Sequence, residues 1–80
     1  MFFVYIVKNN YGKLYIGQTA DLEKRILEHN ESGHGYTSKF RPWKLICSEI
    51  YENRKEAMKR ERYLKTGVGR EWIKNNIKHA

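Results

Sequence analysis

The chain has 80 residues and a mass of 9.6 kDa, which allows one domain over residues 1–80, and its 40% hydrophobic and 31% charged residues exclude a disordered protein. Its longest apolar run, Met1 to Val7, is far shorter than the ~20 residues of a membrane helix, so we expect no membrane anchor, no signal peptide and a cytoplasmic location. The net charge is +7, from 16 Lys and Arg against nine Asp and Glu, and it favours the binding of a polyanion. The alternative is that this charge serves only solubility.

A β-hairpin is predicted at the start of the chain. Residues 2–7 are aromatic and β-branched, which is typical of a strand buried on both faces. Residues 9–12 include two Asn and a Gly, which tolerate the positive φ angles of a tight turn. Residues 13–17 then return as a second, antiparallel strand.

A helix, a loop and a third strand follow. Thr19 or Asp21 caps a helix that runs to about Glu31. Residues 32–42 contain two Gly and the only Pro, which predicts a loop. Residues 44–51 form the third strand, and the single cysteine within it excludes an internal disulfide and a cysteine-based zinc cluster.

Two more helices complete the chain. Asn53 and Glu56 resemble a capping box, and the helix that they start runs to Lys65, with Gly67 as its C-terminal cap. A short last helix follows over residues 69–77. The order β-β-α-β-α-α predicts an α+β fold, in which a three-stranded antiparallel β-sheet is flanked by helices.

A carboxylate lies on the predicted core-facing side of the helix that begins after residue 53. At 100° per residue, Glu61 lies within about 60° of Ala57 and Leu64. An inward carboxylate is costly unless it is paired or binds a metal. The alternative is an ion pair with Lys65, one helical turn away.

Two further pairs of side chains carry possible chemistry. Arg25 and His29 lie one turn apart on the first helix, which suits a phosphate, although a solvated helix face is the alternative. Tyr5 and Tyr15 lie on the two hairpin strands, and whether they share a face depends on the register. The alternative for these tyrosines is packing in the core.

Five blocks of the sequence, taken in order, resemble the GIY-YIG nuclease domain over residues 2–76. They are Tyr5-Ile6-Val7, Leu14 to Thr19, Asp21 to Arg25, His29-Asn30 and Glu56 to Lys65. The Gly of the first motif is replaced in Phe3-Val4-Tyr5, but only the Tyr is needed chemically. The chain looks like the small single-domain bacterial members.

The resemblance implies a fold of three antiparallel strands with flanking helices, and one-metal hydrolysis of a phosphodiester. It implies that Glu61 holds the divalent ion, Mg²⁺ or Mn²⁺, and that Tyr5 and Tyr15 position or deprotonate the attacking water. It further implies that Arg25 stabilises charge on the scissile phosphate, with His29 beside it. An Asn that steadies the substrate or the active-site loop in this family has two candidates here, Asn75 and Asn76.

The predicted function is therefore a metal-dependent DNA endonuclease, a hydrolase, with a monomer as the default state. Residues 53–80 carry nine cations and three anions, so +6 of the net charge lies there. The candidate phosphate contacts are Lys59, Arg62, Lys65, Arg70 and Lys74. One alternative is a basic nucleic-acid-binding module with little or no cleavage, and another is a small adaptor that binds protein.

Overall fold

The structure, a computed structural model, describes residues 1–31 and 39–78 of the chain. Its elements are β1 (Phe2–Asn9), β2 (Leu14–Thr19), α1 (Leu22–Glu31), β3 (Trp43–Tyr51), α3 (Arg54–Leu64) and α4 (Gly67–Asn76). Three antiparallel strands in one sheet and the order β-β-α-β-α-α confirm the predicted α+β fold. Most of the predicted loop over residues 32–42 lies outside the described residues.

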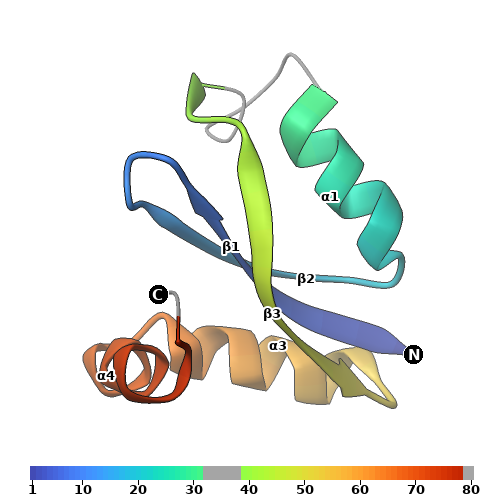
Figure 1. Cartoon of the computed structure of the whole chain (residues 1–80). Coiled ribbons are helices and arrows are strands. Elements are labelled where there is room, and N and C mark those ends of the chain that lie inside the picture. Colours follow the sequence, from blue (N-terminus) through green and yellow to red (C-terminus); the bar gives the residue numbers. More distant parts are fainter. Residues whose placement is uncertain (32–38, 79–80) are drawn as a thin grey trace.

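The central strand of the sheet is β1, because the strand order is β2-β1-β3. In Figure 1 helix α1 lies on one side of the sheet, and α3 and α4 lie on the other. Val4 and Ile6 pack with α3 and α4, whereas Tyr5 and Val7 pack with α1. The predicted burial of this strand on both faces is confirmed, and it explains the unbroken run of aromatic and β-branched residues.

The hairpin turn is closed by Asn9. Its side-chain Oδ1 accepts hydrogen bonds from the backbone N–H groups of Tyr11 and Lys13, at 3.0 and 2.8 Å. Gly12 has a φ of 81°, a conformation that glycine adopts without strain. This turn fixes a register in which Tyr5 lies opposite Gly17 on β2.

Two predicted helix starts are confirmed. The backbone N–H of Lys24 donates to Asp21 Oδ1 at 3.2 Å, and that of Glu56 donates to Asn53 Oδ1 at 2.9 Å. The predicted role of Gly67 is wrong, because α3 ends at Leu64 and Gly67 begins α4. Thr66 caps α4 through its side chain, so the two helices meet with no left-handed residue between them.

The rotation of α3 about its axis is set by Arg60. Its guanidinium donates to both carboxylate oxygens of Glu49 on β3, at 2.9 and 3.2 Å, and lies 4.4 Å from the ring centre of Trp72 on α4. Because successive helical residues are about 100° apart, this attachment directs Glu61 to a different side of α3. Within the described ranges, no helix is both long and apolar enough to span a membrane.

Gly69 is expected to be essential for the contact between α3 and α4. A Cβ atom added at Gly69 would lie 2.6 Å from the Cα of Leu64, whereas one added at Gly67 would meet nothing within 4 Å. We expect Gly69→Ala to lower the free energy of unfolding by about 1–3 kcal/mol, because backbone atoms must move.

Gly67→Ala is the matched control, and we expect it to leave stability unchanged or to raise it by about 0.4–1 kcal/mol. Urea unfolding followed by circular dichroism measures both variants. Equal stabilities of the two variants would contradict the packing described for this corner.

Candidate active site

The phenol of Tyr5 lies across the backbone of Gly17. Tyr5 is 1% exposed, and the two residues are direct partners in the β1–β2 ladder. A Cβ atom at residue 17 would lie 2.5 Å from the Tyr5 hydroxyl oxygen, so the phenol occupies the space that any other residue would fill. The glycine therefore permits Tyr5 to extend over β2.

Two side chains of α1 reach the Tyr5 hydroxyl. His29 Nε2 lies 2.7 Å from this oxygen, and Arg25 Nε donates to it at 3.3 Å. The structure thus brings together Arg25 and His29, which the sequence placed one turn apart. Tyr15 completes the cluster, with its ring centre 4.8 Å from that of His29 and 6.4 Å from that of Tyr5. The two tyrosines share a face of the sheet.

Burial raises the pKa of the Tyr5 phenol above its usual value of 10.0. The hydrogen bond and the charge of Arg25 lower this pKa, and the nearby Tyr15 and the charge of Glu61 raise it. Tyr5 is therefore a neutral phenol at neutral pH and has a hydroxyl proton to donate.

His29 is 2% exposed, and burial lowers its pKa below 6.5. The positive charge of Arg25 also lowers this pKa, and Glu28 acts in the opposite direction. The imidazole is therefore neutral at pH 7. Because Arg25 donates to the Tyr5 oxygen, we assign the hydroxyl proton of Tyr5 to a hydrogen bond with His29 Nε2, which leaves the ring proton of His29 on Nδ1.

Glu61 lies within electrostatic range of the cluster, since its charge raises the pKa of Tyr5. Its side chain is 23% exposed, and its Oε2 accepts a hydrogen bond from Lys65 Nζ at 2.7 Å. The ion pair that the sequence offered as the alternative for Glu61 is therefore present in the structure.

The donor atoms near Glu61 suit only one type of metal site. In the part of the chain that the structure describes, no group of three or more His, Cys, Asp and Glu side chains is placed to hold an ion. A cage made entirely of protein ligands does not fit. A single carboxylate fits Mg²⁺, because this ion keeps several waters and is completed by substrate phosphates.

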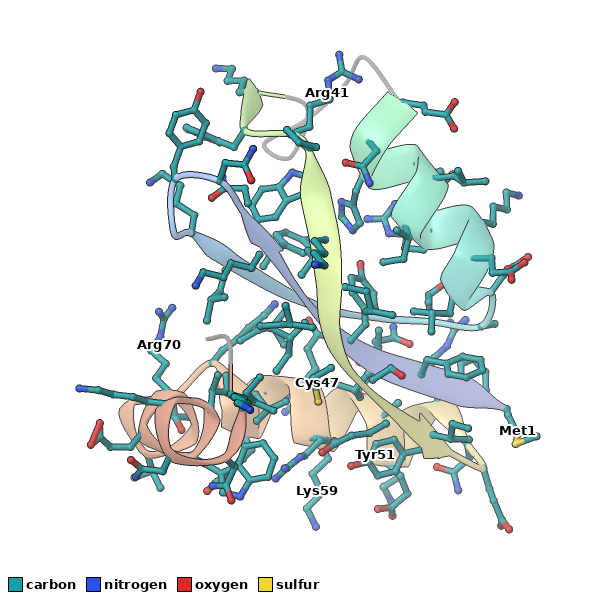
Figure 2. The ribbon with its side chains drawn as sticks, viewed as in Figure 1. Met1, Arg41, Cys47, Tyr51, Lys59 and Arg70 are labelled. Carbon is teal, nitrogen blue, oxygen red and sulfur yellow. The ribbon has the colours of Figure 1, made fainter. Side chains whose placement is uncertain are left out.

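A pocket of about 260 Å³ adjoins Tyr15. Its lining residues are Leu14, Tyr15, Ile16, Lys65, Arg70 and Ile73. Two of the five candidate phosphate contacts, Lys65 and Arg70, therefore share a pocket with Tyr15. In Figure 2 Arg70 extends from α4 toward the side of the β1–β2 hairpin.

The other candidate phosphate contacts are not part of this pocket. Lys59 lines a separate pocket with Tyr51 and Glu56, and Figure 2 shows it pointing away from the sheet. Arg62 and Lys74 are exposed on α3 and α4. The structure therefore separates the basic residues of the last third into a group beside Tyr15 and residues elsewhere on the two helices.

Sequence reasoning missed the role of Asn30. Its Oδ1 accepts from the backbone N–H of Trp43 at 2.6 Å, and its Nδ2 donates to the carbonyl of Trp43 at 3.0 Å. These bonds attach the end of α1 to β3 and so hold His29 against the sheet. No signal within a few residues of Asn30 indicates this role, because its partner Trp43 lies 13 residues further along the chain. The two late asparagines are exposed on α4, where Asn76 donates to the carbonyl of Trp72 at 2.8 Å.

The lowered pKa of His29 predicts a pH dependence of stability. A histidine whose pKa is lower in the folded state stabilises the fold above its unfolded pKa of about 6.5. This contribution is lost as the pH falls from about 6.5 through the folded-state pKa, because the unfolded chain takes up the proton first. Thermal melts at pH 7.5 and 5.5 should therefore show a larger loss of Tm for the wild type than for His29→Gln, which cannot titrate. Equal losses would show that His29 is not held neutral.

The chain is similar to known proteins over most of its length. A family model described as the GIY-YIG catalytic domain matches residues 1–75. A UPF0213 protein of Staphylococcus saprophyticus is 45% identical over 65 residues, which cover 80% of this chain and 79% of the relative. One from Staphylococcus epidermidis is 42% identical over 73 residues, which cover 90% and 89%.

A solved structure is also similar to this chain. The solution NMR structure of a UPF0213 protein from Bacillus halodurans has a TM-score of 0.58 and 29% identity, and the match covers 94% of this chain and 84% of that one. The names of these relatives give a family and no activity. The family model matches nearly the whole chain, and the chain belongs to the GIY-YIG catalytic domain family.

Proposed function

We propose that this protein is an endonuclease that hydrolyses phosphodiester bonds in DNA and uses one divalent ion, Mg²⁺ or Mn²⁺, held by Glu61. The observation that carries the proposal is the hydrogen-bonded cluster at the Tyr5 hydroxyl, which lies beside a pocket with two cationic residues. Membership of a family described as a catalytic domain supports it. The proposal treats residues 1–80 as one catalytic domain, active as a cytoplasmic monomer.

Arg25 is the residue that we assign to the scissile phosphate. Its Nε is used by Tyr5, which fixes the direction of the guanidinium, while its side chain remains 40% exposed. An exposed ion pair with Glu28 at 3.4 Å contributes little and is readily exchanged. The free N–H groups of Arg25 can then donate to phosphate oxygens and stabilise their developing charge.

The two tyrosines have different roles in this proposal. Tyr15 is partly exposed and packs beside His29 and Tyr5, and we assign its hydroxyl to holding or deprotonating the attacking water. Tyr5 is buried, and it acts by holding Arg25 and His29 in position. When bound, the divalent ion supplies positive charge that polarises the phosphate and the attacking water.

DNA is the proposed partner because of the positive charge beside Tyr15. We assign Lys65 and Arg70 to backbone phosphates next to the scissile bond, because both line the pocket that Tyr15 adjoins. Arg62, Lys74 and the more distant Lys59 can contribute to the attraction of the polyanion.

A binding module without cleavage is the second candidate. The observation that favours it is the ion pair between Glu61 and Lys65, because a carboxylate occupied by an ammonium group is not free to hold a divalent ion. A cleavage assay of the wild type and of site variants separates the two candidates.

We expect each of Glu61→Gln, Tyr5→Phe and Tyr15→Phe to slow the Mg²⁺-dependent cleavage of duplex DNA by about 10²–10⁴-fold. The amide at residue 61 removes the charge that holds the ion, and each phenylalanine keeps the ring but removes the hydroxyl. The loss in the double tyrosine variant should be smaller than the product of the single losses, because the groups act on one reaction centre. The measurement is cleavage of plasmid and of branched DNA with Mg²⁺, Mn²⁺ or chelator.

Glu56→Gln and Tyr11→Phe are the matched controls, since both positions are exposed and lie outside the cluster. They should cleave at the wild-type rate. Near-wild-type cleavage by both tyrosine variants and by Glu61→Gln would contradict the proposed mechanism. DNA binding by the wild type with no cleavage under any metal condition would favour the binding module.

A further inference from the structure

The ion pair between Glu61 and Lys65 conflicts with the proposed function. Lys65 Nζ lies 2.7 Å from Glu61 Oε2, which is a short, charge-assisted hydrogen bond. An ammonium group at this distance would lie next to any divalent ion on the same carboxylate, and the two positive charges would repel each other strongly at the protein surface. Lys65 and the ion therefore compete for Glu61.

The backbone of Lys65 is held by the helix, whereas its side chain is exposed. Lys65 is the C-cap of α3, where its backbone N–H donates to the carbonyls of Arg62 and Glu61 at 3.2 and 3.3 Å. Its side chain is 48% exposed and has four rotatable bonds. The ammonium group can thus leave Glu61 without any change in the helix.

The pocket beside Tyr15 is the place to which this ammonium group can move. Lys65 already lines that pocket together with Arg70, which lies near the start of the next helix. A phosphate between these two cations would form charge-assisted hydrogen bonds to both. Tyr15 also lines this pocket, so a phosphate held there would lie beside β2, the strand that carries Tyr15.

We propose that Lys65 is a positioning residue that changes partners: it neutralises Glu61 in the metal-free protein, and it turns to a DNA phosphate beside Arg70 when a divalent ion takes its place. The inference rests on the proposed function in using Glu61 as the metal-binding carboxylate and DNA as the partner. It implies that the metal and DNA promote each other's binding, because each removes the competitor of the other.

The first test measures Mn²⁺ binding to the whole protein without DNA, by electron paramagnetic resonance of the free ion. We expect Lys65→Met, which keeps the aliphatic chain but removes the charge, to bind Mn²⁺ about two- to fivefold more tightly than the wild type. Lys55→Met removes the same charge from an exposed position of α3 and should leave Mn²⁺ affinity unchanged within error. Glu61→Gln should lose most of the binding.

The second test measures the salt dependence of duplex DNA binding in chelator and in Ca²⁺. In the wild type, the log–log slope should become steeper in Ca²⁺ than in chelator by about 0.9, the value of one additional phosphate contact. In Lys65→Met this increment should be absent, whereas Lys55→Met should retain it. A lysine that only stabilises the helix would change neither the Mn²⁺ affinity nor this increment.

The outcomes separate this inference from the proposed function. If Glu61→Gln loses Mn²⁺ binding but Lys65→Met binds the ion no more tightly than Lys55→Met, the exchange of partners is wrong and the proposed metal site stands. If Glu61→Gln binds Mn²⁺ as well as the wild type, the metal site is wrong, and the exchange with it. If neither the wild type nor Lys65→Met binds Mn²⁺, the exchange is contradicted. Binding by Lys65→Met alone would support it.

Discussion

The arrangement of the candidate site depends on the hydroxyl group of Tyr5. A buried hydroxyl without hydrogen-bond partners lowers the free energy of unfolding by about 1–3 kcal/mol. The Tyr5 hydroxyl has two such partners, His29 and Arg25. Both partners come from α1, so this helix must dock with one particular face on the sheet. The strand beside Tyr5 must offer a glycine at residue 17, because the phenol occupies the place of a side chain. The contacts of this one hydroxyl thus determine how β1, β2 and α1 are placed relative to one another.

Glu61, the acidic residue of the candidate site, comes from α3, which packs on the opposite face of the sheet from α1. Arg60 bonds to Glu49 on β3 and stacks on Trp72, and these contacts fix how α3 is rotated. Glu61 therefore lies within electrostatic range of Tyr5, although α3 and Tyr5 pack on different faces of β1. A central strand buried on both sides thus brings side chains from two helical layers within electrostatic range of one another.

The sequence predicted the parts of this structure that local chemistry determines. Asn53 accepts from the N–H three residues later, and Gly12 adopts a positive φ, both for reasons that lie within a few residues. The spacing of Arg25 and His29 likewise follows from helical geometry alone. Gly67 was misassigned because Gly is common both after a helix and, less strongly, at the start of one, and only the capping of α4 by Thr66 distinguishes the two. The roles of Gly17 and Asn30 depend on Tyr5 and Trp43, which are distant in sequence, so no local pattern reveals them.

The site is held together by the hydroxyl proton that Tyr5 donates to a neutral His29. The ¹⁵N chemical shifts of the His29 imidazole, measured by NMR at pH 7.5, test it most directly, since they identify both the charge and the tautomer. We expect a neutral ring that is protonated at Nδ1, with Nε2 as a hydrogen-bond acceptor. A charged imidazolium, or a neutral ring protonated at Nε2, would contradict it, because either form would donate to Tyr5 and leave the buried hydroxyl proton without its acceptor.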